Sequence, residues 1–354
     1  MTSKQIPIAL VGLGWVGTHR HAVAISKSRD YKLVGVVDRN LERAVTLGNK
    51  LRVLSCNAEN LAKVPWIGEV KAVAIATPPH SHFDLVSEAL DEGLDVLTEK
   101  PFAMHLEQGE AMFEKARQRG RILAVMHNFQ FSRSALMLRR DIDSGKLGHI
   151  RRMHAVQLSN PRRRLPVWYE TLPGGLFFDE SPHLLYLMRG FSSGGVTLEH
   201  ATILDSSEGY QTPDLVQARY TGISEQGYSF PLTLDMHFSA PVSEWHFAVM
   251  GDEAMGIVDV FRDIYIRLPN DGLHTTKTVI RSSFAATTQH WLQHFSSGLK
   301  HLSGTLDYGN NEVYRRFASA IRMREEPPGI SATDALDVLR MQRQLLNCRK
   351  AKND

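Results

Sequence analysis

The stretch Ile6-Pro-Ile-Ala-Leu-Val-Gly-Leu-Gly-Trp-Val-Gly17 decides the fold of this chain. It reads as a short apolar strand followed by the pattern G-x-G-x-x-G, with Gly12, Gly14 and Gly17 in the glycine positions. The first glycine permits a tight turn, the second lets a pyrophosphate approach the backbone, and the third allows close packing of helix on strand. The N-terminus of the following helix supplies N–H groups and partial positive charge that favour a phosphate.

An acidic residue at the end of the next strand completes this pattern. Asp38 ends the run Val36-Val37-Asp38, 21 residues beyond Gly17. A carboxylate in that place can accept hydrogen bonds from the adenosine ribose hydroxyls of a dinucleotide. The glycines alone are weak support for a dinucleotide site. The strand, the glycines and the acidic residue at the expected spacing together indicate a bound dinucleotide. Asp38 would repel a 2′-phosphate, so NAD is the expected cofactor, while Arg39 beside it keeps NADP open as an alternative.

Length and composition restrict the class of protein. The chain has 354 residues, which favours two domains, and a net charge of +3, which gives no reason to expect nucleic acid. Cys56 and Cys348 lie near opposite ends of the chain, which indicates a reducing compartment and no disulfide framework. No signal peptide precedes the first strand, and no apolar run approaches the ~18–20 residues of a membrane span. We therefore expect a cytoplasmic protein without a membrane partner.

Short strands alternate with helices in the first third of the chain. This alternation predicts an α/β Rossmann domain, a doubly wound parallel sheet, over residues 1–128. The loops after its strands should line the ligand crevice. Strands are expected at 6–11, 32–37, 72–76, 94–97 and 122–126, and helices near 15–26, 41–51, 81–92 and 106–119.

The pattern changes after about residue 128. Strand-like runs without intervening helices predict an α+β domain with a large, mostly antiparallel sheet over residues 129–354. Its broad exposed face should carry the contacts of a homodimer or homotetramer. Trp291, Phe295 and Leu299 recur at intervals of four, which predicts one buried stripe on the first C-terminal helix. Strands are expected at 151–158, 201–205, 215–221, 232–238, 246–250 and 256–260, and helices at 135–144, 288–302, 312–323 and 332–347, some of which can pack back on the first domain.

Two short segments have the residue types of a reaction centre. Lys100, in Thr98-Glu-Lys-Pro101, follows an expected parallel strand, and Pro101 disfavours helix at that point and fixes the direction of the chain. Taken alone, a surface lysine before a loop proline is the simpler interpretation. Asp179 and His183 follow a glycine pair, and a helix beginning near Glu180 would place Asp179 at its N-cap and His183 in its first turn. Singly, these two residues could be a cap and a buried histidine.

Together, these segments resemble the Gfo/Idh/MocA family of oxidoreductases. The resemblance is carried by the glycine fingerprint, by Glu99-Lys100-Pro101 and by Gly174-Gly175 with Asp179 and His183. Further similar stretches are Ala76-Thr-Pro-Pro-His-Ser-His82, His127-Asn-Phe-Gln-Phe-Ser and Gly145-Lys-Leu-Gly-His-Ile150, so the resemblance covers nearly the whole chain. The departures are Ser181 at a usual glycine, Tyr186 at a frequent second aspartate and Gln130 at a frequent arginine.

The resemblance implies hydride transfer between NAD, with NADP as an alternative, and a secondary alcohol or ketone carbon of a sugar, polyol or cyclitol. His183 would be the general acid or base, Lys100 would stabilise charge on the reacting oxygen, and Asp179 would hold a neighbouring hydroxyl or orient the other two. The implied cofactor-binding residues are Gly12, Leu13, Gly14, Trp15, Val16, Gly17, Asp38, Arg39, Thr77, Pro78, His82, Glu99, Lys100 and Asn128.

Three other functions stay open at this point. A glycoside hydrolase with retained NAD would show no net NADH formation. A nonenzymatic nucleotide-binding regulatory protein would have no need of Lys100, Asp179 and His183 together. A reductase of imine-like or aromatic-derived substrates would have less use for the lysine and histidine.

Other polar clusters allow two interpretations each. The pairs His19/His21 and His80/His82 could suggest a metal, but residues two apart on a helix point away from each other, so no metal site is expected. Arg162-Arg-Arg164 is either a solvated basic loop or a lid that recognises an anionic substrate group. Trp15 packs either over the cofactor or over its own helix.

Overall fold

The computed structural model describes residues 4–163, 165 and 168–350, in two compact units. The first unit contains Met1–Asn128 and Asn310–Arg340, and the second contains Phe129–Gly309 and Met341–Asp354. The chain thus leaves the first unit after Asn128 and returns to it at Asn310. Arg164 of the basic loop lies outside the described residues.

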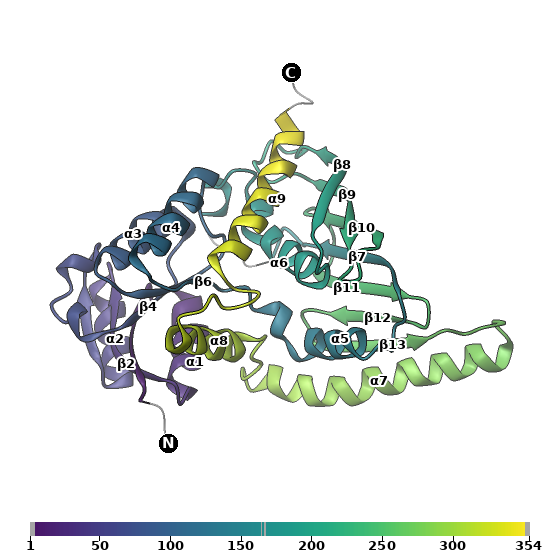
Figure 1. Cartoon of the computed structure of the whole chain (residues 1–354), viewed down its shortest axis with the longest axis horizontal. Coiled ribbons are helices and arrows are strands. Elements are labelled where there is room, and N and C mark those ends of the chain that lie inside the picture. The colour runs from purple at the N-terminus through teal and green to yellow at the C-terminus, as the bar shows by residue number, and fades with distance from the viewer. Residues whose placement is uncertain (1–3, 164, 166–167, 351–354) are drawn as a thin grey trace. The chain divides into compact units, whose positions relative to one another are not determined.

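The first unit is built on a six-stranded parallel sheet (Figure 1). Its strands are β1 (Ile6–Val11), β2 (Tyr31–Asp38), β3 (Leu54–Asn57), β4 (Ala72–Ile75), β5 (Asp95–Thr98) and β6 (Leu123–Val125). Their order is β3-β2-β1-β4-β5-β6, and every pair is parallel. The order reverses where β1 lies between β2 and β4, the kind of place where doubly wound sheets bind ligands. The expected Rossmann sheet is confirmed.

Helices connect these strands because the intervening segments are amphipathic and capped. Asn40, for example, accepts a hydrogen bond from the backbone N–H of Arg43 at 3.0 Å and so caps the second helix. The chain does not form one α-helix over 15–26, since Gly17–His21 is a π-helical turn (η1) that precedes α1. The helices of the unit are α1 (Ala22–Lys27), α2 (Leu41–Leu51), α3 (His82–Asp91), α4 (Leu106–Arg119), α8 (Asn310–Met323) and the first part of α9 (Ala332–Lys350), with short 3₁₀ turns at Leu61–Lys63, Ile67–Glu69 and Pro79–Ser81.

The second unit contains a seven-stranded sheet. Its strands are β7 (Ile150–Leu158), β8 (Val196–Leu204), β9 (Leu215–Ile223), β10 (Ser229–His237), β11 (Glu244–Gly251), β12 (Ala254–Asp259) and β13 (Ile264–Pro269). The order is β13-β12-β11-β7-β10-β9-β8, and only β7 and β10 pair in parallel. The mostly antiparallel sheet is therefore confirmed. One face is buried, as the alternation of Val216, Ala218 and Tyr220 in β9 shows.

Helices α5 (Arg133–Asp143), α6 (Leu176–Phe191) and α7 (Thr276–Leu302) belong to this unit, with 3₁₀ turns at Phe129–Phe131 and Tyr169–Thr171. Helix α6 packs on β7 and is buried over nearly its whole length. Among the helices of residues 4–163, 165 and 168–350, none combines the length and apolarity that a membrane span needs.

Helix α7 differs from its prediction in two respects. It begins at Thr276, twelve residues before the predicted start at 288. The stripe of Trp291, Phe295 and Leu299 is 56%, 59% and 68% exposed, so the prediction that it is buried is wrong. The physical reason is that α7 packs on β13 through its polar side, as described below.

Two strands have no counterpart among the predicted ones. Both β3 and β13 lie at an edge of their sheets, where one side of the strand has no neighbouring strand. In β3 the residues are exposed or half-buried, so its sequence lacks the alternation or the apolar run that marks a strand.

Candidate functional site

The glycine loop after β1 is shaped by its own packing. A Cβ added to Gly17 would lie 1.9 Å from the carbonyl oxygen of Gly12, and one added to Gly12 would lie 2.7 Å from Cγ2 of Thr77. Gly12 also has φ +88°, a conformation that glycine adopts without strain. A Cβ on Gly14 would meet nothing within 4 Å. The loop itself therefore requires the outer two glycines, while the middle one borders open space, which fits a closely approaching pyrophosphate.

Asp38 ties the end of β2 to this loop. Its Oδ2 accepts a hydrogen bond from the backbone N–H of Leu13 at 2.7 Å, and its Oδ1 accepts one from Asn40 at 2.8 Å. A carboxylate has about four acceptor positions, so these two bonds leave capacity for ribose hydroxyls. Arg39 beside it is exposed. The carboxylate thus orders the loop besides its predicted role in nucleotide binding.

The loop after β4 is joined to the loop after β5 by one histidine. The ring of His82 is buried, with Nδ1 2.8 Å from the carbonyl oxygen of Pro101 and Nε2 2.9 Å from that of Thr77. Thr77 also accepts a hydrogen bond from the Ser81 hydroxyl at 2.8 Å, and Pro78 leads into that turn. Because both ring nitrogens of His82 face protein carbonyls, the histidine positions these two loops.

Trp15 and Val16 lie on the outer side of the glycine motif, 51% and 38% exposed. The Trp15 ring stacks on His19 at a centroid distance of 5.3 Å, and the Arg20 guanidinium carbon lies 5.2 Å from the Trp15 ring centroid. Trp15 therefore packs on its own helical turn, one of the two arrangements that the sequence allowed.

Glu99 and Lys100 follow β5 directly and are held by a buried polar chain. Glu99 Oε2 accepts a hydrogen bond from the Lys100 backbone N–H at 3.1 Å, and Oε1 lies 2.8 Å from His21 Nε2. His21 Nδ1 lies 2.7 Å from the hydroxyl of Tyr314 on α8, whose carbonyl accepts from the Tyr31 hydroxyl at 2.7 Å. The Lys100–Pro101 peptide bond is cis. In the sequence, His21 stood out only as part of a histidine pair for which no metal was expected, and no pattern marked Tyr314.

Burial raises the pKa of Glu99, but the hydrogen bond and charge of His21, together with the charge and backbone N–H of Lys100, outweigh it, so that the pKa lies below its ordinary value of 4.5. A carboxyl group with a depressed pKa stabilises the folded state above pH 4.5, and this contribution is lost as the pH falls through the lowered pKa. Glu99→Gln should therefore cost about 1–3 kcal/mol of unfolding free energy near neutral pH. The difference from wild type should narrow below pH 4.5.

Urea unfolding near neutral pH and again below pH 4.5 checks this expectation. The exposed Glu69 provides a matched control, because Glu69→Gln should leave the stability within about 0.5 kcal/mol of wild type. A Glu99→Gln effect that stays constant over this pH range would show that Glu99 is not stabilised as the anion.

The predicted residues of the first unit gather at one edge of its sheet. Gly12, Asp38, Thr77, Glu99 and Asn128 follow the carboxyl ends of β1, β2, β4, β5 and β6 in the parallel sheet. Since these ends share one edge, the residues lie where a doubly wound sheet binds its ligand.

The second group of predicted residues lies on α6, but the helix begins earlier than predicted. Its first residue is Leu176 and not Glu180, so Asp179 lies in the first turn and is not the N-cap, and His183 lies in the second turn. Pro182 is inside the helix, although proline is most frequent in a first turn, which explains the late predicted start. Asp179 and His183 are four residues apart, on the same face, and both are 9% exposed.

His183 is oriented by Tyr186. The Tyr186 hydroxyl oxygen accepts a hydrogen bond from the Phe129 backbone N–H at 3.0 Å and lies 2.9 Å from His183 Nδ1. A hydroxyl oxygen has two acceptor positions, so it can also accept a hydrogen bond from Nδ1–H, and a neutral His183 of that tautomer carries no proton on Nε2. The ring also packs against Phe129 at 4.7 Å and Trp245 at 5.4 Å between centroids. The tyrosine that the sequence presented only as a departure from the family pattern is thus the partner of the histidine.

Removing the Tyr186 hydroxyl should lower both the stability of the protein and the catalytic rate, because this group orients His183. Tyr186→Phe leaves His183 Nδ1 and the Phe129 N–H without this partner, so we expect a loss of about 1–3 kcal/mol in unfolding free energy. We expect kcat to fall on the order of ten-fold, the equivalent of about 1.4 kcal/mol in the transition state. Steady-state kinetics beside Tyr210→Phe, at a 55% exposed tyrosine, check this. Equal kcat in wild type and Tyr186→Phe would show that Tyr186 does not orient His183 for the reaction.

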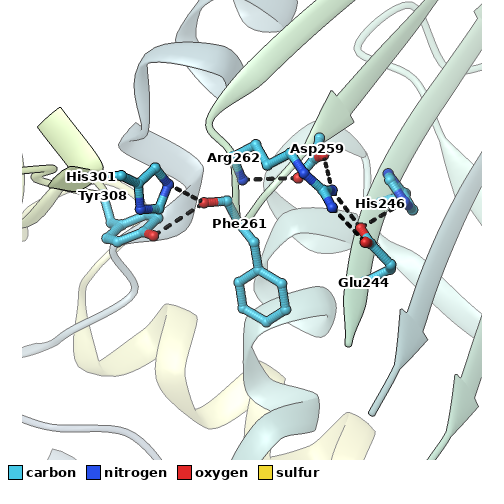
Figure 2. A network of polar contacts seen from close by, with 7 residues as sticks. All are labelled: Glu244, His246, Asp259, Phe261, Arg262, His301 and Tyr308. Atoms are coloured by element: carbon cyan, nitrogen blue, oxygen red, sulfur yellow. Dashed lines mark hydrogen bonds and ion pairs between the residues drawn. The ribbon is translucent and has the colours of Figure 1, made fainter. Parts of the chain in front are cut away.

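A second polar network joins Arg262 to Glu244 and Asp259 (Figure 2). Arg262 donates to both carboxylate oxygens of Glu244, at 2.5 and 2.6 Å, and to Asp259 at 2.6 Å. The hydrogen bonds from Arg262 hold the pKa of Glu244 below its usual value. Phe261, the neighbour of Arg262, packs on Trp245 at 4.8 Å between centroids. The ion pairs of Arg262 thereby hold in place the neighbouring Phe261, which packs on Trp245. Trp245 itself contacts the ring of His183.

The basic loop is partly neutralised within its own unit. Arg163 forms an ion pair with the buried Glu180 on α6, which also accepts a hydrogen bond from Ser159 at 3.2 Å. Arg162 is exposed. Arg163 is therefore an ion-paired charge and not simply a solvated one. Among the residues that the structure describes, no group of three or more His, Cys, Asp or Glu side chains could hold a metal ion.

Comparison with known proteins agrees with this geometry. Residues 6–127 match the family described as "Oxidoreductase family, NAD-binding Rossmann fold". The chain is 30% identical over 192 residues to D-glucoside 3-dehydrogenase of Escherichia coli, which covers 52% of this chain and 53% of that protein. It is 27% identical over 207 residues to inositol 2-dehydrogenase of Rhizobium meliloti, covering 58% and 61%. The chain thus matches between about half and three-fifths of the length of these relatives.

A solved structure extends the similarity to the whole fold. The WlbA dehydrogenase from Bordetella pertussis, in complex with NADH and UDP-GlcNAcA, has a TM-score of 0.77 at 18% identity. The similarity covers 99% of this chain and 97% of that one, and at this identity it shows the fold alone. Residues 6–127 thus match the NAD-binding Rossmann fold of the Gfo/Idh/MocA oxidoreductases, and the whole chain shares the fold of a solved dehydrogenase structure.

Proposed function

We propose that this protein is an NAD(P)-dependent dehydrogenase or reductase that acts on a secondary alcohol or ketone carbon of a sugar, polyol or cyclitol. The observation that carries the proposal is the edge of the parallel sheet, where the glycine loop, Asp38 and Glu99-Lys100 follow neighbouring strands. Relatives named as a glucoside and an inositol dehydrogenase support the substrate class. Nucleotide binding is assigned to residues 1–128 and substrate binding to residues 129–354.

Each candidate residue has a chemical task in this proposal. The Lys100 ammonium group would donate a hydrogen bond to the reacting oxygen and stabilise negative charge as it develops there. His183 would accept the hydroxyl proton in oxidation, or return it in reduction, through the ring nitrogen that does not face Tyr186. Asp179 would hold a neighbouring substrate hydroxyl or orient the two other groups electrostatically.

The residues of the first unit fit a nicotinamide dinucleotide. Gly12, Gly14 and Gly17, with Leu13, Trp15 and Val16 between them, would hold its pyrophosphate, and Asp38 its adenosine ribose. Thr77 and Pro78 would pack beside it, and Glu99 and Asn128 would lie at the nicotinamide end. When bound, the nicotinamide ring supplies the acceptor or donor of the hydride.

NAD should be preferred over NADP, because Asp38 repels a 2′-phosphate. We expect wild type to bind NADH at least ~10-fold more tightly than NADPH, since like charges side by side cost several kcal/mol. Asp38→Ser should remove most of that preference and leave Arg39 to pair with the phosphate. Titration of reduced-nicotinamide fluorescence measures both affinities without a known substrate, and Arg39→Ala in the Asp38→Ser background should weaken NADPH again. Equal wild-type affinities would contradict this assignment.

Two further features belong to the proposal. Homodimer or homotetramer formation through the outer face of the antiparallel sheet follows from the breadth of that face. A cytoplasmic location is supported by the free cysteines Cys56 and Cys348, which suit a reducing compartment.

The reaction class is tested by nicotinamide absorbance. Purified protein is supplied with NAD or NADP separately, against inositols, aldoses and sugar acids, and the supernatant of denatured protein is assayed for nucleotide. Reduced nucleotide that forms with one substrate group supports the proposal. Stoichiometric nucleotide in the supernatant, together with glycoside cleavage and no net reduction, would favour a hydrolase with retained cofactor.

A further inference from the structure

Helix α7 presents its apolar side away from the protein. Several of these side chains repeat at intervals of four and seven residues, so they form one stripe along the helix. We refer to them together as the α7 face. It consists of Ile280, Phe284, Trp291, Leu292, Phe295, Leu299 and Leu302, which are between 56% and 88% exposed.

Helix α7 lies along the edge strand β13 (Figure 1), to which its opposite, polar side is hydrogen-bonded. Gln293 accepts a hydrogen bond from the Tyr265 backbone N–H at 2.8 Å and donates one to the Tyr265 carbonyl. Gln289 does the same with Arg267, at 2.9 and 3.1 Å. The two glutamines thus pair with the backbone groups that an edge strand leaves without a neighbouring strand. The orientation of α7, polar side inward, is therefore fixed by specific bonds.

Further bonds fix the C-terminal half of α7. The Ser297 hydroxyl donates to the Asp263 carbonyl at 3.2 Å, and His301 Nε2 lies 2.9 Å from the Phe261 carbonyl oxygen (Figure 2). Arg133 on α5 donates to the Ser296 hydroxyl at 2.6 Å. A rotation of the helix that buried the α7 face would break all of these hydrogen bonds. The bonds therefore keep the α7 face exposed to solvent.

The charge pattern of α7 restricts its partner. From Ser282 to Leu299 the helix contains no Asp, Glu, Lys or Arg, and Lys277, Arg281 and Lys300 flank this stretch. An acidic protein surface would find no charge to pair with along the centre. A helix that lies on a membrane needs a polar side rich in Lys and Arg. Here the inward side carries glutamine, serine and histidine, which are bonded to β13 and to the residues before it. An uncharged apolar surface of matching length fits best.

We infer that the α7 face packs against the α7 face of a second copy of this chain, about a twofold axis near Trp291. At ~200 Å² per large side chain, the seven exposed residues offer on the order of 900 Å². A standard interface buries about 800 Å² per partner, and a monomer rarely exposes so large a patch. Residues 280 and 302 are equally distant from Trp291, so an antiparallel pair matches the stripe to itself, as an isologous interface requires. This surface is separate from the sheet face that the proposed function assigns to oligomer contacts.

Sedimentation velocity of the full chain, over a wide range of protein concentration, tests this interface. Phe284→Glu/Phe295→Glu should weaken association at least ~100-fold and remove one level of assembly, from tetramer to dimer or from dimer to monomer. Leu41→Glu/Tyr210→Glu is the matched control, at residues 61% and 55% exposed elsewhere, and should associate like wild type. Circular dichroism and thermal unfolding establish that both variants fold.

Added salt and lipid vesicles distinguish self-association from two other partners of the α7 face, a charged protein surface and a membrane. In the antiparallel pair, Arg281 of one copy lies near Lys300 of the other, so added NaCl should leave association unchanged or strengthen it. A wild type that stays monomeric, or a Phe284→Glu/Phe295→Glu variant that associates like wild type, would overturn the inference. So would association that salt weakens ten-fold, or binding to phosphatidylserine vesicles that the same variant abolishes while self-association is absent.

Discussion

Replacing Lys100 by alanine is expected to lower kcat at least ~100-fold, while nucleotide affinity changes far less. The side chain follows β5 at the ligand edge of the sheet, and its backbone N–H is fixed by Glu99 at 3.1 Å. A cation held in this way contributes mainly where negative charge develops on the reacting oxygen, that is, in the transition state. Steady-state kinetics and a nucleotide titration, on the same preparations, measure the two quantities.

Lys115 provides the matched control for this experiment. It lies on α4 in the same unit and pairs with Asp91 at 2.6 Å at the surface, away from the ligand edge. Lys115→Ala should keep wild-type kcat. If Lys100→Ala also keeps wild-type kcat on a verified substrate, Lys100 has no catalytic role.

Replacing Gly17 by alanine is expected to abolish nucleotide binding and to destabilise the protein by ~2 kcal/mol or more. The added Cβ would lie 1.9 Å from the carbonyl oxygen of Gly12, so the loop must move away from the strand that positions it. Such overpacking costs about 1–3 kcal/mol or more when backbone must shift. Thermal unfolding without nucleotide and isothermal titration with NADH separate the two effects.

Two other glycine-to-alanine variants serve as comparisons for Gly17→Ala. A Cβ on Gly14 meets nothing within 4 Å, so Gly14→Ala should fold like wild type but bind NADH at least ~10-fold more weakly, because the methyl group would occupy the approach of the pyrophosphate. Gly68→Ala, also in open space but outside the loop, should change neither property. Wild-type NADH affinity in Gly17→Ala would contradict the assignment of this loop to the nucleotide.

The parts of the site that lie within short segments were predictable from the sequence. The glycine loop, Asp38 and Glu99-Lys100 each stand next to a strand with a clear apolar run, so the order of strands and loops places them at one edge. The α/β character of the first sheet followed from the alternation of strands and helices, and the mostly antiparallel character of the second followed from strand-like runs without intervening helices. These features depend on neighbours in the chain, which is the information that a single sequence contains.

Other parts depend on residues far apart in the chain. His21, Glu99 and Tyr314 meet only because α8 returns to the first unit, and no local pattern marks that contact. Pro182 led to a predicted start of α6 that is too late, because proline usually marks a first turn. In the structure this buried helix contains the proline in its interior. Period alone predicted a buried stripe on α7, but the glutamines that bond to β13 decide which side faces inward.

The most direct test of the central claim is deuterium transfer. A sugar or cyclitol that the absorbance assay identifies is prepared with deuterium on its secondary carbinol carbons and incubated with the protein and oxidised nucleotide. Mass spectrometry then follows the nucleotide. We expect reduced nucleotide that carries deuterium with wild type, and labelling at least ~100-fold slower with Lys100→Ala. Substrate consumption without deuterium on the nicotinamide would contradict hydride transfer as the reaction of this protein.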